Sequence, residues 1–122
     1  MANRILRGAK TVMVVDDEEG ICDTLRDLFE DEGYTVGVAT NGREALALLQ
    51  RLSPKPCIVI LDLLMPVLDG NAVYREMKAD AALMDIPVVI ATSDPSRAPS
   101  GALIMRKPLN VDVLLDMVRK CC

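Results

Sequence analysis

The sequence predicts an α/β fold in which parallel strands form one doubly wound sheet with helices on both faces. Two observations predict it. Short apolar runs alternate along the chain with segments whose apolar residues recur every three or four positions, which is the order of strand–helix–strand units. Two of the apolar runs end in aspartate, at the strand end where such folds bind ligands. We expect a single domain over residues 1–122, with right-handed crossovers between strands.

The expected strands are short, mostly apolar runs rich in β-branched residues. The first and third are almost wholly apolar, as are strands that are covered on both faces of a parallel sheet. The five runs cover Thr11–Val15, Tyr34–Ala39, Cys57–Leu61, Ile86–Thr92 and, with a weaker signal, Ala102–Met105.

Helical patterns fill most gaps between these strands. The first helix ends at Gly33, and the second begins at Asn41 with Glu44 three positions later, the spacing of a capping box. The third runs from about Gly70 to Lys78, and the last follows Asn110 as its cap. Residues spaced to face the core are Ile21, Leu25, Leu28 and Phe29, then Ala45, Leu48, Leu49 and Leu52, then Val73 and Met77, and finally Val111, Leu114, Leu115 and Val118.

The segment between the last two strands breaks the alternation. Only residues 93–101 join these strands, and they include Pro95 and Pro99. A crossover with a helix takes about 10–12 residues or more, and prolines break a helix interior. Since this segment, fully extended, reaches about 30 Å, it can return along a strand without a helix. We therefore expect an irregular loop or a single turn in place of a fourth helix.

Composition narrows the functional classes. Hydrophobic residues make up 51% and charged residues 26% of the chain, and no apolar stretch approaches the roughly 20 residues of a transmembrane helix. The net charge of −4, without a Lys/Arg-rich run, argues against nucleic acid as a direct partner. Residues 1–10 lack a signal-peptide core. We expect a cytoplasmic protein with no membrane partner, whose residues 1–10 form a flexible or partly ordered lead.

The four cysteines do not predict a metal site, because they have no CxxC spacing and the chain has no histidine. We expect Cys22 and Cys57 to be small buried hydrophobic residues. Cys121 and Cys122 are expected at a frayed end of the chain, where oxidation could cross-link two chains.

Three aspartates stand at the ends of predicted strands. Asp16 and Asp17 follow the first strand, and Asp62 follows the third. If these strands are neighbours, the three carboxylates converge. Two unit charges about 4 Å apart repel by roughly 4 kcal/mol at an effective dielectric near 20, and a divalent cation relieves that repulsion. By themselves Asp16 and Asp17 fit a helix start equally well, whereas Asp62 between apolar runs is costly unless paired or metal-bound.

Four motifs together resemble the receiver domain of two-component response regulators. They are Val-Val-Asp16-Asp17-Glu, Asp62-Leu-Leu-Met-Pro66 followed by Asp69-Gly70, Thr92 at a strand end, and Lys107-Pro108. Each motif is weak alone, but four at the appropriate strand ends, covering nearly the whole chain in order, are specific. The resemblance implies a flavodoxin-like five-stranded sheet in the order 2-1-3-4-5, a loop shaped by Pro66 and Gly70, and a cis Lys107–Pro108 peptide.

The resemblance also implies a function, that of a phospho-accepting switch or relay module rather than a turnover enzyme. Asp62 would accept a phosphoryl group from a histidine kinase or phosphotransfer protein. The module would then act on a downstream output protein or a covalently linked domain. Lys107 and Thr92 would contact the phosphoryl oxygens.

A metal site and two modulating residues are implied as well. Mg²⁺ or Mn²⁺ would be held directly by Asp17 and Asp62, by Asp16 through water, and by the carbonyl of Leu64. Leu64 overhangs the approach of water to the phosphoryl group and offers no hydrogen bond, so slow hydrolysis is expected. Asp94, two positions after Thr92, is the only nearby acid that could compensate.

The sequence departs from the family in two places. Ile104 occupies the position, three before Lys107, where receivers usually carry an aromatic residue, so the aromatic movement coupled to Thr92 cannot occur. A missing fourth helix removes surface that the family commonly uses to dimerise or to contact an output domain.

Two other functional classes remain open. A pseudo-receiver would bind a partner without phosphorylation, and Mg²⁺ binding would distinguish it. A phosphatase or mutase of the haloacid dehalogenase type also uses a strand-end aspartate, but wants a second aspartate two residues on, where this chain has Leu64. Neither common Gly-rich phosphate loop is present, so nucleotide binding is not expected.

Overall fold

The computed structural model describes residues 10–122; residues 1–9, where most of the expected N-terminal lead falls, lie outside the described residues. Five parallel strands form one sheet in the order β2-β1-β3-β4-β5, which is the expected order. Every expected strand is present, with its ends shifted by two residues at most. The strands are β1 Thr11–Val15, β2 Thr35–Ala39, β3 Ile58–Asp62, β4 Val88–Thr92 and β5 Leu103–Arg106.

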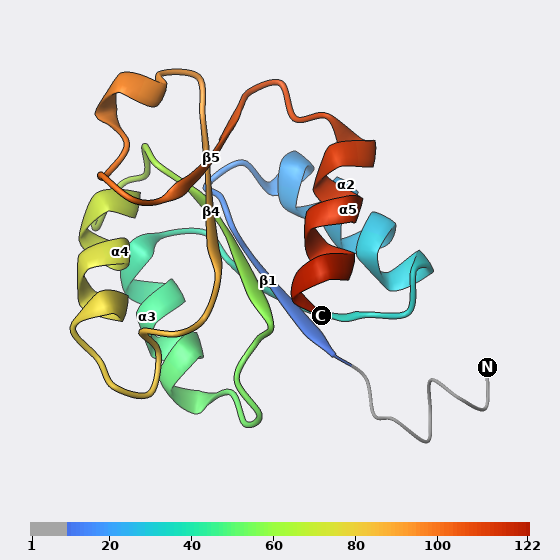
Figure 1. The fold of residues 1–122 in the computed structure, drawn as a ribbon, viewed down its shortest axis with the longest axis horizontal. Helices are drawn as coiled ribbons and strands as arrows, with labels where there is room; N and C mark the ends of the chain where they lie inside the picture. Colours follow the sequence, from blue (N-terminus) through green and yellow to red (C-terminus); the bar gives the residue numbers. More distant parts are fainter. Residues whose placement is uncertain (1–9) are drawn as a thin grey trace.

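Helices cover both faces of the sheet (Figure 1). Helices α2 (Glu19–Asp31) and α5 (Val111–Cys121) lie on one face, and α3 (Gly42–Arg51) and α4 (Gly70–Lys78) lie on the other. This is the doubly wound arrangement that the alternation of strand and helix predicts. Among the described residues, no helix combines the length and the apolar character that a membrane crossing needs.

Side chains of the central strand β3 point alternately into two hydrophobic cores. Ile58 and Ile60 pack under α2 and α5, whereas Val59 and Leu61 pack under α3 and α4. All four are at most 2% exposed, and full burial of such a side chain contributes about 1.5–3 kcal/mol. Because successive side chains alternate, Asp62 continues onto the α2/α5 side, where the functional cluster lies.

The helix ends follow their sequence signals, with two differences. Asn41 Oδ1 accepts the Glu44 amide at 2.8 Å, but the Glu44 carboxylate accepts from the amide of Thr40, one residue before the position a capping box predicts. Gly33 has a φ of 98° just after α2, a conformation that glycine adopts without strain. Val111 is 44% exposed, so its placement on the buried face of α5 was wrong. It is the first residue of α5, before the turn that reaches the sheet.

The connection from β4 to β5 contains a single 3₁₀ turn, η1 (Pro95–Arg97), as the two prolines predict (orange, Figure 1). The side-chain amide of Asn71 in α4 donates to the Arg97 carbonyl at 3.1 Å, which fixes the turn to the neighbouring helix. Ala98 and Ala102 pack against the core under α3 and α4. A short segment of small residues therefore takes the place of a helix on this part of the sheet.

The expectations for three of the four cysteines were wrong. Cys22 is buried as expected, but Cys57 is half-buried and forms a disulfide with Cys122, with their Cα atoms 5.4 Å apart. Cys121 closes the last turn of α5 instead of fraying. A helix that follows a strand of a parallel sheet runs back to the edge where the strands begin. The end of α5 therefore meets the start of β3, a contact that no local pattern predicts.

Candidate functional site

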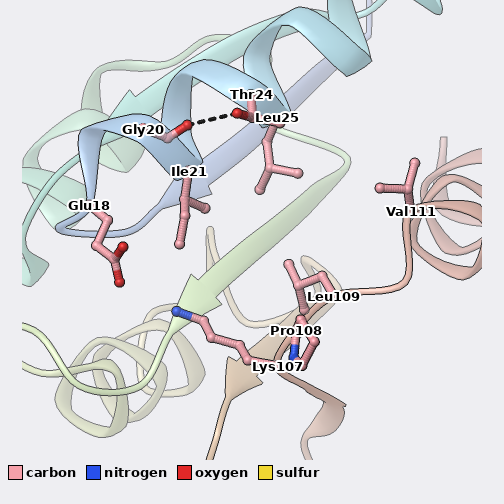
Figure 2. Close-up of a pocket in the computed structure, with 9 residues that line it drawn as sticks. All are labelled: Glu18, Gly20, Ile21, Thr24, Leu25, Lys107, Pro108, Leu109 and Val111. Atoms are coloured by element: carbon pink, nitrogen blue, oxygen red, sulfur yellow. Dashed lines mark hydrogen bonds between the residues drawn. The ribbon is translucent and has the colours of Figure 1, made fainter.

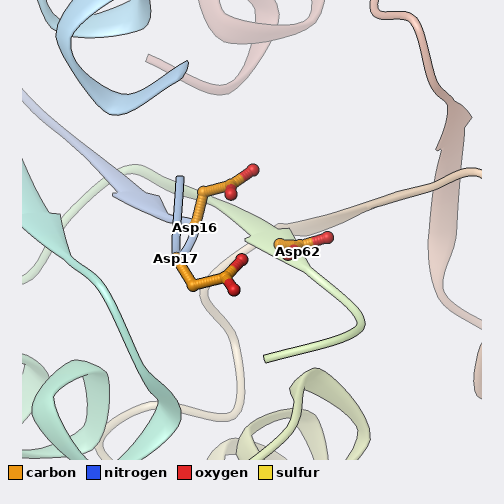
Figure 3. A group of neighbouring side chains, drawn as sticks. All are labelled: Asp16, Asp17 and Asp62. Carbon is orange, nitrogen blue, oxygen red and sulfur yellow. The ribbon is translucent and has the colours of Figure 1, made fainter. Parts of the chain in front are cut away.

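Three carboxylates meet at the carboxyl edge of the sheet, as expected from their strand ends. Figure 3 shows Asp16 and Asp17 after β1 and Asp62 at the tip of β3. One carboxylate oxygen from each residue lies within 4.8 Å of the others. Strands β1 and β3 are neighbours in the sheet, and Val15 pairs with Leu61, so the residues that follow them are adjacent. Asp16 and Asp62 are buried and Asp17 is exposed, so the cluster opens to solvent on one side.

Backbone contacts hold Asp16 in place. Its amide donates to the Ala39 carbonyl at 3.1 Å, and its Oδ1 accepts the Glu18 amide at 2.9 Å. The Cys22 thiol donates to the Asp16 carbonyl at 3.2 Å, and burial is the main cause that raises the pKa of this thiol. Sequence reasoning missed the role of the Glu18 amide, because a backbone donor has no residue-type signal.

Lys107 bridges the two buried carboxylates. Its Nζ lies 3.2 Å from Asp16 Oδ2 and 3.1 Å from Asp62 Oδ1. Met105 of β5 packs into the α2/α5 core, and the side chain two residues later points to the same side of the sheet. The Lys107 amide donates to the Thr92 carbonyl at 2.9 Å, which continues the pairing of β5 with β4. The Lys107–Pro108 peptide is cis, as the resemblance implies.

The environment perturbs the protonation of this cluster. Burial, followed by the negative charge of Asp16, raises the pKa of Asp62 to about 6, although the hydrogen bond from Lys107 works in the opposite direction. Burial lowers the pKa of Lys107, but its hydrogen bond to Asp62 and the charge of Asp16 outweigh burial, so the net shift is upward. Lys107 therefore remains a cation at neutral pH. A further positive charge near Asp62 would stabilise its ionised carboxylate.

Thr92 lies at the end of β4 and is 2% exposed. Its Oγ1 accepts the amide of Asp94 at 3.0 Å, which leaves the hydroxyl hydrogen free to donate. The Asp94 carboxylate instead contacts η1: it accepts the amide and hydroxyl of Ser96, and this hydrogen bonding lowers the pKa of Asp94. The Leu64 side chain is 53% exposed. Leu64 lies two residues after Asp62 in the sequence. The Asp94 carboxylate is held by its hydrogen bonds to Ser96 of η1.

The loop between β3 and α4 passes close to the acids. The Gly70 amide donates to the Leu63 carbonyl at 2.8 Å, and a Cβ at Gly70 would collide with the Asp62 carbonyl. The Leu68 amide donates to the Pro66 carbonyl at 2.8 Å around Val67, whose φ is 71°. This is a γ-turn of the strained, positive-φ kind. Sequence reasoning attributed the loop shape to Pro66 and Gly70 but missed Val67, since a β-branched residue is not typical of that conformation.

A groove of about 500 Å³ lies beside Lys107, between the start of α2 and the segment that joins β5 to α5. Figure 2 shows Ile21 and Leu25 of α2 on one side and Leu109 and Val111 on the other, with the Lys107 ammonium directed toward the tip of β3. The lining is therefore mainly apolar, and it includes Lys107, which contacts Asp16 and Asp62.

Comparison with known families identifies this architecture. The model of the response regulator receiver domain matches residues 12–119, which is most of the chain. The chain belongs to this family. Receiver domains of response regulators are signalling switches.

Curated relatives and solved structures agree with this assignment. The chain is 38% identical over 115 residues to the response regulator MprA of Mycolicibacterium vanbaalenii, covering 88% of this receiver and 48% of that protein. It is 39% identical over 82 residues to SaeR of Staphylococcus aureus, covering 67% of this chain and 34% of SaeR. The receiver thus spans about half or less of these relatives.

Among solved structures, the receiver domain of a signal transduction histidine kinase from Syntrophus aciditrophicus has a TM-score of 0.83 and 32% identity, covering 93% of this chain and 89% of that one. The chemotaxis protein CheY4 of Vibrio cholerae has a TM-score of 0.81 and 27% identity, covering 94% and 100%. Similar receivers thus occur both within sensor kinases and as short chains.

Proposed function

We propose that this receiver accepts a phosphoryl group on Asp62 from the phosphohistidine of a histidine kinase or phosphotransfer protein. The observation that supports this most strongly is the environment of Asp62. It is a buried carboxylate at the tip of β3, with a pKa raised to about 6, two acids on one side and the Lys107 ammonium in contact. Such a group is a nucleophile whose negative charge is only partly neutralised by its own protein.

A divalent cation completes the proposed site. The donor set consists of carboxylate oxygens from Asp16, Asp17 and Asp62, which is the ligand chemistry that Mg²⁺ and Mn²⁺ favour. Asp17 and Asp62 would bind the ion directly, Asp16 through water, and the Leu64 carbonyl would add a backbone ligand. When bound, the ion neutralises charge on the acids and on the incoming phosphoryl group.

Asp62, Lys107 and Thr92 have different roles in the proposed phosphoryl transfer. An Asp62 carboxylate oxygen forms the new bond to phosphorus as the bond from phosphorus to the donor imidazole breaks, and the imidazole leaves with the electron pair. Lys107 already contacts Asp62 Oδ1 at 3.1 Å, and a small movement brings its ammonium to a phosphoryl oxygen. Thr92 donates its hydroxyl hydrogen to another phosphoryl oxygen, an interaction that favours the phosphorylated state.

The groove beside Lys107 supports a protein as the phosphoryl donor. Its apolar side chains, including Ile21 and Leu109, share the groove with Lys107, which contacts Asp62, so a partner docked there would place its histidine near Asp62. Substitution Ile21→Asp is expected to slow transfer from a phosphorylated partner by about tenfold, which is roughly 1.4 kcal/mol. Labelling by a small acyl phosphate should remain at its original rate, and an equal loss with both donors would contradict this role of the groove.

The receiver would act as a switch or relay module in the cytoplasm rather than as a turnover enzyme. In this proposal residues 1–122 form a single receiver domain. The output is a downstream protein or a linked domain, because the curated relatives are about twice as long as this chain. Neither nucleic acid nor a membrane is a direct partner of this module, given its net charge of −4.

The test is labelling with a small acyl phosphate and Mg²⁺, followed by intact-mass measurement and peptide mapping. Wild type should gain one phosphoryl group on Asp62, and Asp62→Ala should gain none. Asp85→Asn is a matched control, because Asp85 is an exposed acid outside the cluster. Labelling at another residue would overturn the proposal. Absence of labelling with several donors, together with retained binding of a partner, would establish the pseudo-receiver alternative.

A further inference from the structure

Three of the four cysteines gather at the edge of the sheet opposite the acidic cluster. Cys57 directly precedes β3, and Cys121 and Cys122 end α5, so residues 65 positions apart in sequence meet. All three side chains pack against the core under α2 and α5, and all three are half-buried. The 5.4 Å between the Cα atoms of Cys57 and Cys122 lies within the usual range for a disulfide.

The surroundings of Cys57 suit the thiol as well as the disulfide. Its Sγ lies 3.2 Å from the Thr11 carbonyl oxygen, which can accept a hydrogen bond from the thiol once the disulfide is reduced. Its own amide already donates to the same carbonyl at 2.9 Å, and the Cys122 amide donates to Val118 at 2.9 Å. These backbone contacts do not depend on the disulfide. Both redox states therefore fit the same local backbone.

These three cysteines are more exposed to solvent than the fourth, Cys22. Cys22 is 2% exposed, its thiol donates to Asp16, and burial raises its pKa, so it is a poor nucleophile. Cys57 and Cys122 are within reach of small reagents because they are only half-buried. The free thiol of Cys121 is adjacent to Cys122 along the chain. Thiol–disulfide exchange requires that a sulfur of the exchanging pair be accessible, and the half-burial of Cys57 and Cys122 meets that requirement.

We propose that Cys57 and Cys122 form a reversible dithiol–disulfide site that exchanges with a small disulfide of the glutathione type. In oxidation, the Cys57 thiolate attacks one sulfur of the small disulfide, which releases one small thiol and leaves a mixed disulfide. The Cys122 thiolate then attacks Cys57 Sγ, forms the internal disulfide and releases the second small thiol. Two protons and two electrons pass from the protein to the small disulfide. This site lies beyond the proposed phosphoryl transfer and uses none of its residues.

The covalent bond has a mechanical consequence. It joins the start of β3, whose other end bears Asp62, to the end of α5, whose first turn lines the groove beside Lys107. It also closes a chain segment of 65 residues, which restricts the unfolded state. The oxidised protein is expected to melt about 10 °C above the reduced protein.

The test equilibrates the purified protein in glutathione buffers from fully reduced to fully oxidised, alkylates free thiols and maps them by mass. Oxidation should protect Cys57 and Cys122 together, within one chain, and raise the melting temperature. Cys57→Ser and Cys122→Ser should lose the increase. The control Cys121→Ser should retain it, because its thiol is outside the bonded pair.

Three results would overturn the proposal. They are free Cys57 and Cys122 thiols in every buffer, an oxidised product joined between chains or through Cys121, and a melting temperature that rises equally in Cys57→Ser. If a serine variant folds poorly, the melting temperatures of the reduced and oxidised wild-type protein still test the proposal. Phosphoryl labelling of Asp62 is not part of the readout, so failure of the proposed function would leave this result unaffected.

Discussion

At the scale of single residues, Lys107 holds together two carboxylates that would otherwise repel each other. Its Nζ contacts both Asp16 and Asp62, and its side chain is only 20% exposed. Unit charges about 4 Å apart interact by roughly 4 kcal/mol at an effective dielectric near 20. The Lys107 ammonium does not offset the burial of Asp62 and the negative charge of Asp16, which is why the pKa of Asp62 remains raised to about 6. The buried acids therefore lower the free energy of unfolding of the protein while they make Asp62 reactive.

Substitution Asp62→Asn tests this cost. The folded-state pKa of about 6 lies above the ordinary value of 3.8, so wild type loses stability as the pH rises through this window. The neutral amide avoids that loss. In a chelator, Asp62→Asn should be about 1–2 kcal/mol more stable than wild type above pH 6, and the advantage should disappear toward pH 4. Urea unfolding across this range is the measurement, and a pH-independent difference would contradict the assignment.

Substitution Leu64→Asn tests how water reaches the proposed acyl phosphate. The Leu64 side chain offers no hydrogen bond, and the Asp94 carboxylate is engaged by Ser96. An amide at position 64 can orient a water molecule, so we expect the phosphorylated lifetime to shorten about fivefold, or roughly 1 kcal/mol of barrier. Phosphate release at fixed Mg²⁺ measures it. Met84→Asn, at another exposed apolar position, is the control. An unchanged or longer lifetime in Leu64→Asn would show that residue 64 does not control the access of water to the acyl phosphate.

At the scale of elements, the segment from β3 to α4 determines how closely a helix can approach the acids. Asp69 Oδ1 accepts the Ala72 amide at 2.9 Å and caps α4, and Gly70 places the first turn against the backbone of Asp62 and Leu63. Absence of a Cβ at Gly70 permits this contact. A larger residue would separate α4 from the tip of β3.

Substitution Gly70→Ala tests this close approach. The added Cβ would meet the Asp62 carbonyl and the Leu63 Cα, neither of which can move without shifting β3. We expect a loss of about 2–3 kcal/mol in the free energy of unfolding. Gly20→Ala, in the first turn of α2, is the matched control because nothing lies within 4 Å of its added Cβ. It should gain about 0.5–1 kcal/mol, and similar losses in both variants would refute the role of Gly70.

At the scale of the whole molecule, the site exists only in the folded chain. Lys107 is 91 residues from Asp16 and 45 from Asp62, and the order of strands brings all three to one edge. The two cores on either face of the sheet hold that edge together. A ligand that binds the assembled acids therefore binds the folded state alone.

Mg²⁺ should accordingly stabilise the protein by mass action. An ion that binds only the folded state at one hundred times its dissociation constant contributes about 2.7 kcal/mol. We expect the melting temperature to rise with Mg²⁺ and to fall again when a chelator removes it. Asp17→Asn should lose the increase, whereas the exposed control Asp85→Asn should retain it. The same increase in Asp17→Asn would show that the ion binds elsewhere.

The sequence by itself determined the local elements and the place of the acids. Apolar periodicity set the strands and helices to within a few residues, because it reflects which face of each element is buried. Pro95 and Pro99 excluded a helix before β5, and the strand-end positions of Asp16, Asp17 and Asp62 made their convergence predictable. Each of these inferences depends on a short stretch of chain.

Only the tertiary structure decided which distant groups touch. Positions 45 to 91 residues apart are joined by the contacts of Lys107 with Asp16 and Asp62 and by the Cys57–Cys122 disulfide. The raised pKa of Asp62 also depends on residues distant in the sequence. The exposure of Val111 and the γ-turn at Val67 were likewise not predicted from the sequence. Such contacts arise when the sheet assembles, and desolvation depends on everything that surrounds a group in the folded chain, so no local pattern contains them.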